Sequence, residues 1–354
     1  MLLLAAGTGC WQPDFCDPDR IVFLDEDLEE RVRDRLAVYD RDLTREDIEG
    51  LVELDASASN IESVRGLECA VNLVSLDLSR NPVRDVEPLT SLPDLAWLDL
   101  SETAVTDWDS VGRMESLRGL VLDRVEIVDA DLAHIAHLAD LERLVLTNDA
   151  LYDVAPLAGL GALESLDLSG NLLDDGAVAA LSALPRLVRL ELSGNRIAGT
   201  DALALPPGLE SLDLADNVVA DVGPLAAQGT LRSLDLRRNA QLVDIDPLGG
   251  LASLVGLDLS ATAVADVAAL ASLPNLAFVD LRNTNLDCAV STMVLDDLHA
   301  TVVEANAGQL LLDCDLDCAG IWGGPNREDL CGTCDDDPGN DQTLIDPNLR
   351  EIVA

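Results

Sequence analysis

Residues 163–171 read LESLDLSGN, and residues 209–217 read LESLDLADN. Both stretches alternate leucine with polar residues. This pattern is typical of a strand with one buried face, because successive side chains of a strand point to opposite faces. The leucines at the fourth and sixth positions then point inward, and the aspartate between them points outward. The two stretches therefore predict short strands and raise the question of what that aspartate meets.

The same pattern, LxxLxL, recurs along most of the chain. Its starting residues are Leu51, Leu73, Leu95, Leu117, Leu141, Leu163, Leu187, Leu209, Leu231, Leu254 and Leu276. Successive starts lie 22, 22, 22, 24, 22, 24, 22, 22, 23 and 22 residues apart. Eleven units of so regular a period predict a solenoid in which each unit stacks on the next.

A short polar residue stands eight places after most of these starting leucines. The position holds Asn81, Asn171, Asn195, Asn217, Asn239, Thr103, Thr262, Thr284, Ser59 and Asp149, with Val125 as the exception. In a coil that leaves backbone groups unpaired, such a side chain can bond neighbouring N–H and C=O groups. The spacing therefore predicts an internal polar row that turns the chain out of each strand.

After that turn, several units read DVxPL or a close variant, as in residues 85–89, 153–157, 221–225 and 244–248. Proline suits the first turn of a helix, where its missing N–H costs nothing. We therefore expect short 3₁₀ or α turns on the convex side. The two 24-residue units, with DADLAHIAHL at 129–138 and DDGAVAALSAL at 174–184, predict fuller α-helices.

The last regular repeat is followed by an atypical unit over residues 286–312. Its stretch CAVSTMVLDDLHATVVEAN predicts a convex helix and then one closing strand near Val302. Such a unit would cap the exposed end of the sheet.

Residues 313–341 form a Cys- and Asp-rich segment without apolar periodicity. Cys314, Cys318, Cys331 and Cys334 are disulfide candidates, and their spacing, C-x3-C-x12-C-x2-C, can also be drawn as a zinc site. An exported location favours disulfides. The alternating Asp313, Asp315 and Asp317 suggest calcium, although the run lacks the glycine and glutamate of an EF-hand loop.

The N-terminus, MLLLAAGTGC, resembles the end of a bacterial lipoprotein signal: an apolar run, small residues and then Cys10 for lipidation. It lacks a basic region, and Gly7 stands where that motif usually has leucine. An ordinary cleaved or truncated signal is the alternative. We interpret residues 1–20 as signal, lipid anchor and tether. With Cys10 lipidated, seven of the eight cysteines remain, so one is unpaired within the chain or pairs outside it.

Taken together, the chain resembles the internalin-like bacterial leucine-rich repeat proteins over residues 21 to about 305. FLDEDLEERVRDRL at 23–36 and the stretch from Leu43 to Leu73 resemble the helical N-terminal cap and first repeat of that group. The resemblance implies an α/β right-handed solenoid with a parallel concave β-sheet, convex 3₁₀ or α turns, and a helical cap at residues 21–50. Eleven repeats would then occupy residues 51–285. Residues 342–354 look like the start of a second cap.

Proteins of that group are mostly non-catalytic surface or secreted proteins that bind a partner on the concave face. The residue between the two inward positions of each strand is acidic in nine of eleven repeats. Trp97 and Phe278 lie in the same outward surface, and arginines stand two places before or after this position in four repeats, three of which carry an acid there. The candidate partner-binding residues are Asp77, Trp97, Asp99, Arg143, Asp167, Arg189, Glu191, Asp213, Asp235, Asp258, Phe278 and Asp280. The alternative is that the acids are consensus filling of a solvated face.

The chain carries 66 acidic and 22 basic residues, a formal charge of −44. Such a charge repels nucleic acid and anionic lipid, so it argues against both as partners. It suits a cationic protein partner. We expect a monomer that meets a membrane only through a lipid anchor, as an outer-membrane or cell-surface lipoprotein, or otherwise a secreted or periplasmic protein.

Catalytic motifs give no support for an enzyme. The sequence has no G-x-S-x-G, H-E-x-x-H, P-loop or dinucleotide fingerprint. His134 and His137 flank a predicted buried stripe and lack a third ligand. We therefore expect no cofactor apart from the possible calcium, and an exported protein-binding scaffold. The alternatives are a structural spacer or stalk of the cell envelope and, from a third class, a hydrolase.

Overall fold

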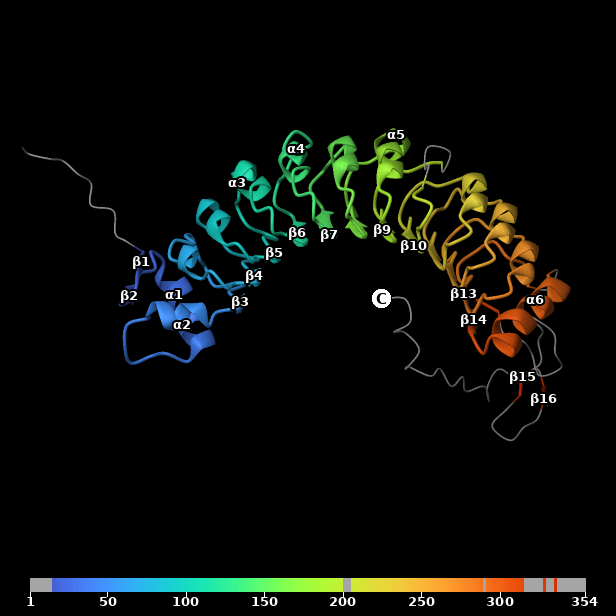
Figure 1. The fold of residues 1–354 in the computed structure, drawn as a ribbon. Helices are drawn as coiled ribbons and strands as arrows, with labels where there is room; N and C mark the ends of the chain where they lie inside the picture. Colours follow the sequence, from blue (N-terminus) through green and yellow to red (C-terminus); the bar gives the residue numbers. More distant parts are fainter. Residues whose placement is uncertain (1–14, 200–204, 289–290, 315–326, 329–333, 336–354) are drawn as a thin grey trace, which may run out of the picture. The chain divides into compact units, whose positions relative to one another are not determined.

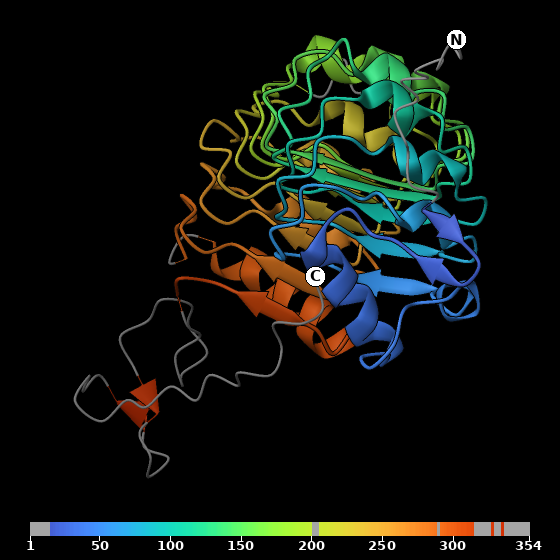
Figure 2. The same ribbon diagram turned by 90° about the vertical axis from the view of Figure 1, so that its left-hand side faces the viewer.

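The computed structural model describes residues 15–199, 205–288, 291–314, 327–328 and 334–335. The chain divides into two compact units. The first comprises residues up to 127 together with 133–141, and the second comprises 128–132 and the residues from 142 onward. In each unit the strands lie on one side and the short helical turns on the opposite side (Figures 1 and 2). Within the described part of the chain, no helix is long and apolar enough to cross a membrane.

The first unit begins with two short antiparallel strands and two helices and continues into four parallel strands. Its elements are β1 Cys16–Asp17, β2 Arg20–Ile21, α1 Glu26–Leu36, α2 Arg45–Glu49, β3 Glu53–Asp55, η1 Leu67–Cys69, β4 Ser75–Asp77, η2 Glu87–Ser91, β5 Trp97–Asp99, α3 Trp108–Gly112 and β6 Gly119–Asp123. The short helix α4, Leu132–Ile135, contains the boundary between the units.

The second unit carries eight strands in sequential, parallel order from β7 to β14. Its elements are β7 Arg143–Thr147, η3 Ala155–Gly159, β8 Ser165–Asp167, α5 Asp175–Val178, η4 Ala179–Ala183, β9 Arg189–Glu191, β10 Ser211–Asp213, η5 Gly223–Ala227, β11 Ser233–Asp235, η6 Asp246–Gly250, β12 Gly256–Asp258, η7 Ala268–Ser272, β13 Phe278–Asp280, α6 Thr292–His299, η8 Ala300–Ala305, β14 Gln309–Leu311, β15 Arg327–Glu328 and β16 Cys334–Asp335.

Residues 163–171 and 209–217 contain the predicted strands, β8 and β10. Leu166 and Leu168 of the first, and Leu212 and Leu214 of the second, have no more than 1% of their surface exposed. Ser211 of β10 pairs with Ser233 of β11 in a parallel register that places equivalent repeat positions side by side. The core is thus a stack of leucine layers, and the fold is the predicted leucine-rich repeat solenoid.

The polar row inside the solenoid holds successive repeats together. The amide of Asn239 donates to the carbonyls of Leu214 and Leu236 at 2.9 and 2.8 Å, and its oxygen accepts from Val219 N at 2.8 Å. Leu214 and Val219 belong to the preceding repeat, so one side chain bonds both turns. The other four asparagines of the row bond in the same way. The predicted role of this position is confirmed.

Threonine at this position makes only the hydrogen bond within its own repeat. Thr262 Oγ1 donates to Leu259 O of its own repeat at 2.7 Å, and Thr103 does the same to Leu100 O at 2.6 Å. A hydroxyl is too short to reach the preceding repeat as the amide does. The repeats with threonine are therefore joined by their leucines and strand pairing.

The DVxPL segments form the predicted 3₁₀ helices, with proline near the N-terminus of η2, η3, η5 and η6. The prediction for the 24-residue units was partly wrong. Their helices α4 and α5 are only four residues long, and α5 runs on into the 3₁₀ helix η4. The expected buried stripe of Leu132, Ile135 and Leu138 is present. The second of these units therefore has four α-helical and then five 3₁₀ residues in succession, whereas the helix of the first is a single short turn.

The end of the array also differs from the prediction. Val302 is buried inside η8, the π-helical continuation of α6, and the closing strand is β14, seven residues further on. The amide of Asn306 donates to the carbonyls of Leu276 and Thr301, which fixes the end of this helix against the last repeat. The predicted strand near Val302 is therefore wrong, because Val302 lies on the buried face of a helix.

Helices α1 and α2 lie in the segment where the sequence predicted a helical cap. Asp25 caps α1 by accepting from Leu28 N, and Thr44 and Asp47 form a capping box at α2. The guanidinium of Arg35 donates to the carbonyl of Glu53 in the first strand of the sheet, at 2.9 Å. A backbone acceptor of that strand is thereby satisfied. That the helices serve as a cap stays a prediction.

Two disulfides join described cysteines: Cys16 to Cys69 in the first unit and Cys288 to Cys314 in the second. Cys314 was among the disulfide candidates, but its partner Cys288 was not. Cys334 begins β16, while Cys10, Cys318 and Cys331 lie outside the described residues, as do residues 342–354. The sequence could not pair these cysteines because connectivity depends on which loops the fold brings together.

We predict that Asn239→Ala destabilises the protein by at least about 2 kcal/mol, because it leaves buried backbone groups of two repeats without partners. Thr262→Ala is the matched control and should cost about 1 kcal/mol, since it removes a single bond within one repeat. Urea unfolding of the two variants gives the comparison. Equal losses would contradict the bridging role of the amide.

The Cys16–Cys69 disulfide closes a loop of 53 residues in sequence. We predict that a Cys16→Ser, Cys69→Ser double variant loses about 2 to 5 kcal/mol of stability, because the reduced unfolded chain has more freedom. Mass spectrometry of the wild-type protein, produced in an oxidising compartment and kept without reductant, should find this pair and the Cys288–Cys314 pair. Recovery of all four as alkylated thiols would overturn the assignment.

Candidate functional site

The acidic row follows the strand side of each unit. Asp55, Asp77 and Asp99 lie in β3 to β5 of the first unit, and the row from Asp167 to Asp280 lies in β8 to β13 of the second. Most of these side chains are exposed or half-buried, as an outward position predicts. Asp235 and Asp280 differ, since only 9% and 3% of their surfaces are exposed.

Every aspartate of the row has a local structural task. Its Oδ1 accepts a hydrogen bond from the backbone N–H two residues further on, at 2.7–3.0 Å, in Asp55, Asp77, Asp99, Asp167, Asp213, Asp235, Asp258 and Asp280. This is an Asx turn, which ends the strand and starts the bend. This turn was not among the predictions, although an aspartate two residues before a bend, as in LDLS, is its usual signal.

A second aspartate of the repeat does the same at the opposite corner. Asp153, Asp221 and Asp244 each accept from the N–H two residues on, at 2.8–3.0 Å, where the 3₁₀ helix begins. Much of the acidity of this chain is therefore tied to turn formation. The two rows share one chemistry and differ in the side of the repeat on which they lie.

In the second unit the strand-side acids are close enough to change one another's ionisation. Burial, and then the charge of Asp167, raise the pKa of Glu191 to about 7. Burial, together with the charges of Asp213 and Asp258, raises the pKa of Asp235 to about 7. Burial also raises the pKa of Asp213. Parallel register places these carboxylates on neighbouring strands, roughly 4.8 Å apart along the sheet.

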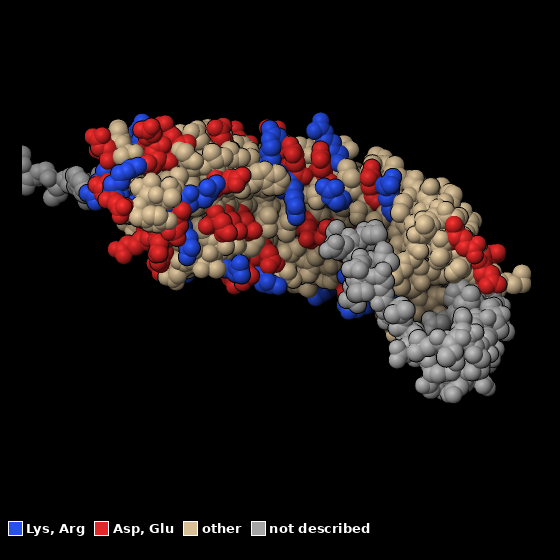
Figure 3. Space-filling view, turned by 90° about the horizontal axis from the view of Figure 1, so that it is seen from below, with Lys and Arg blue, Asp and Glu red and all other residues tan. Residues whose placement is uncertain are grey.

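Arginines offset part of this charge. Arg237 forms an ion pair with Asp235 at 3.1 Å, and Arg282 forms one with Asp280 at 2.5 Å. The arginine two places after the acid therefore explains why these two carboxylates are covered. Arg143 lowers the pKa of Glu191 through its charge, whereas Arg189 makes no ion pair with a described residue. Figure 3 accordingly shows acids and bases interspersed on the strand side.

Trp97 lies on the strand side of the first unit, and 42% of its surface is exposed. Its register partner on β6 is Gly119. A Cβ atom added at Gly119 would lie 2.0 Å from Cε3 of Trp97, so the indole covers the glycine. The ring is held by this cross-strand contact and still offers a face to solvent.

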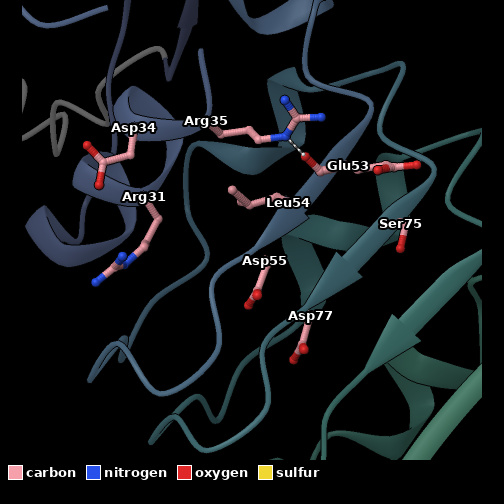
Figure 4. Close-up of a pocket in the computed structure, with 8 residues that line it drawn as sticks. All are labelled: Arg31, Asp34, Arg35, Glu53, Leu54, Asp55, Ser75 and Asp77. Atoms are coloured by element: carbon pink, nitrogen blue, oxygen red, sulfur yellow. Dashed lines mark hydrogen bonds between the residues drawn. The ribbon is translucent and has the colours of Figure 1, made fainter. Parts of the chain in front are cut away.

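Two predicted site residues of the first unit lie near a polar hollow of about 490 Å³. Asp77 lines it, together with Asp55 and with Arg31, Asp34 and Arg35 of α1, as Figure 4 shows. Hydrogen bonds from Ser57, first from its side chain and then from its backbone, lower the pKa of Asp55, with smaller effects of Arg31 and Arg80. Asp99 lies one strand further on.

Phe278 lies on β13 of the second unit, half-buried, and lines a separate apolar hollow of about 470 Å³. Trp97 and Phe278 belong to different units, so each is placed within its own. Both aromatic residues were predicted from the sequence, but the hollow beside Phe278 has no signal there, because it depends on the residues of the neighbouring strands.

Of the three calcium candidates, Asp313 alone is described, and its carboxylate accepts a hydrogen bond from the backbone N–H of Asn283. Asp315 and Asp317 lie outside the described residues. Among the residues that the structure describes, no three His, Cys, Asp or Glu side chains are grouped so as to hold a metal ion.

Comparison with known proteins agrees with this architecture. No protein-family model matches the chain. Among curated proteins, the human leucine-rich repeat-containing protein 56 is 44% identical over 69 residues, which is 19% of this chain and 13% of that protein. The chain thus spans about an eighth of the length of this relative.

Two solved structures from Listeria monocytogenes share the fold over most of their length. An internalin, inlF, superposes with a TM-score of 0.61 at 22% identity, covering 82% of this chain and 95% of the other. Internalin C2 gives a TM-score of 0.53 at 25% identity, covering 69% of this chain and 96% of the other. The repeat array is therefore an internalin-like leucine-rich repeat solenoid.

The raised pKa values make stability depend on pH. Between about pH 4 and 7, the folded protein holds protons on Glu191 and Asp235 that the unfolded chain releases. Stability from these groups is therefore present at low pH and lost as pH rises through about 7. We predict that the melting temperature rises on acidification from about pH 8 to pH 5, and that Glu191→Gln with Asp235→Asn flattens this rise.

The control is a Glu30→Gln, Asp94→Asn variant, which removes two exposed carboxylates and changes the net charge equally. It should keep the wild-type slope of melting temperature against pH. A slope that is the same in both double variants would show that general charge repulsion, and not this pair, sets the pH dependence.

Proposed function

We propose that this protein is an exported, non-catalytic scaffold that binds a cationic segment of another protein on the concave, strand side of its repeats. A general role in protein interaction is the one that the internalin-like fold supports. The finer proposal rests on one observation: Asp167, Glu191 and Asp213 lie in register on neighbouring strands and carry more negative charge than their surroundings balance.

The energetics favour a basic partner at this place. Glu191 and Asp213 are partly desolvated and repel one another, which costs folding free energy in the unbound protein. A lysine or arginine side chain laid across them would relieve that repulsion and restore ionisation. The relief of this repulsion would contribute to the free energy of binding. Long-range attraction would also speed association.

Export is part of the same proposal. The two disulfides between described cysteines suit an oxidising compartment, and so does the signal-like N-terminus, whose Cys10 would carry a lipid. A lipid anchor would leave the repeat array free to meet a partner at the cell surface. A metabolic test with labelled palmitate, compared in wild type and Cys10→Ala, decides this part by itself.

The test of recognition selects peptides from a random display library on the immobilised full chain and measures their association rates. We predict that selected peptides are basic and that their association rate falls at least about tenfold between 0.01 and 0.15 M salt, as the Debye length shortens from about 30 to about 8 Å. The strand-side variant Asp167→Asn, Glu191→Gln, Asp213→Asn should lower the rate at low salt several-fold.

The helix-side variant Asp153→Asn, Asp221→Asn, Asp244→Asn is the matched control. It removes the same charge, and asparagine can keep the same turns, so it should leave the association rate nearly unchanged. If the two triple variants lowered the association rate equally, net charge alone would explain the attraction. A library that yields no binding peptide would favour the spacer role instead.

A further inference from the structure

The apolar hollow of the second unit lies over one position of the sheet. Ser233, Gly256, Phe278 and Gln309 are register partners on β11 to β14, so they form one outward row across four strands. The hollow is lined by this row and by Val255, Ala277, Ala307 and Gly308 beside it, with Arg232 and Asn306 at its polar parts. Its centre is a glycine flanked by an aromatic ring.

The first unit also has an aromatic residue and a glycine as register partners at this repeat position, Trp97 and Gly119, but there the ring covers the glycine. There the ring of Trp97 lies over Gly119, and a Cβ on that glycine would meet the ring at 2.0 Å. At Gly256, an added Cβ would meet no heavy atom within 4 Å among the described residues. Phe278 thus stands beside its glycine without covering it, and no described residue fills the space above Gly256.

The far side of the hollow is built by a close backbone approach. Gln309 N donates to the carbonyl of Ala277 at 2.7 Å, and a Cβ on Gly308 would lie 1.9 Å from that oxygen. Glycine at 308 is therefore required for β14 to reach β13. The hollow is a consequence of regular strand pairing and small residues, which makes it a preformed feature of the fold.

Charge around the hollow is uneven. Arg232 is exposed at its edge, and its guanidinium makes no hydrogen bond or ion pair with any described residue. The acids next along β11 and β13, Asp235 and Asp280, are already paired with Arg237 and Arg282. Among the described residues Arg232 therefore has no carboxylate partner, and its guanidinium can donate to a carboxylate that is brought to it.

We propose that this hollow receives an aliphatic or aromatic side chain of the protein partner, inserted over Gly256 against Phe278, while a carboxylate next to that side chain binds Arg232. The inference rests on the proposed function in that the strand side binds a protein. The inference adds where the partner's apolar side chain binds and which chemical groups contact it. Buried apolar anchors of this kind hold complexes, whereas the acids of β8 to β10 steer their approach.

The test uses anilinonaphthalene sulfonate, which joins apolar rings to one anion, as the probe on the full chain. We expect blue-shifted fluorescence with the wild type. Gly256→Leu should weaken probe binding at least about tenfold by filling the open space, and Arg232→Gln should weaken it several-fold. Because Gly256 has room for a side chain, its variant should melt at or above the wild-type temperature.

Ser211→Leu is the matched control, since it adds the same side chain in the same row on β10, away from the lining residues. It should bind the probe as the wild type does. N-acetylphenylalanine should displace the probe better than its amide, which lacks the carboxylate. Wild-type binding by Gly256→Leu, or equal loss in Ser211→Leu, overturns the hollow as the site.

Failure of this inference can be told from failure of the proposed function. The strand-side triple variant at Asp167, Glu191 and Asp213 lies outside the lining of the hollow and should bind the probe normally. If basic peptides bind and respond to that variant while Gly256→Leu has no effect on the probe, recognition by the acids stands and the anchor is wrong.

Discussion

The structure depends on one constraint: a single repeat of about 22 residues cannot bury its own leucines. Leu166 or Leu212 has its neighbours in the repeats before and after it, and both are almost fully buried. The buried asparagine amides add a directional bond to this stacking, because each joins carbonyls of two successive turns. Leucine supplies the stabilising burial, and asparagine fixes the register in which the repeats stack.

The aspartates follow from the same constraint. A coil of this period must bend sharply at the end of each strand and again before each 3₁₀ helix. A side chain that accepts the N–H two residues on makes such a bend favourable. The strand-side and helix-side rows, represented by Asp213 and Asp221, both do this. Stacking of similar repeats then places these aspartates side by side. The residues that form the turns therefore also form a row of negative charge.

Few positions of the repeat are then free to carry residues that bind a partner. The inward residues belong to the core and the aspartates to the turns, which leaves the outward position two places before the aspartate comparatively free. In this chain it varies widely, from Trp97 and Gly119 in the first unit to Ser233, Gly256 and Phe278 in the second. Variation at this position gives the exposed indole of one unit and the open hollow of the other.

The sequence by itself determined the repeat period, the inward leucines, the polar row, and the 3₁₀ turns at DVxPL, because each of these is local and recurs along the chain. It could not decide three other features. Val302 has the same apolar character in a strand or a helix, and the helix was selected by packing against the last repeat. The partners of Cys288 and Cys314 were set by loops that meet only after folding. The space over Gly256 depends on where the ring of Phe278 comes to rest, and that position is a property of neighbouring strands in the tertiary structure.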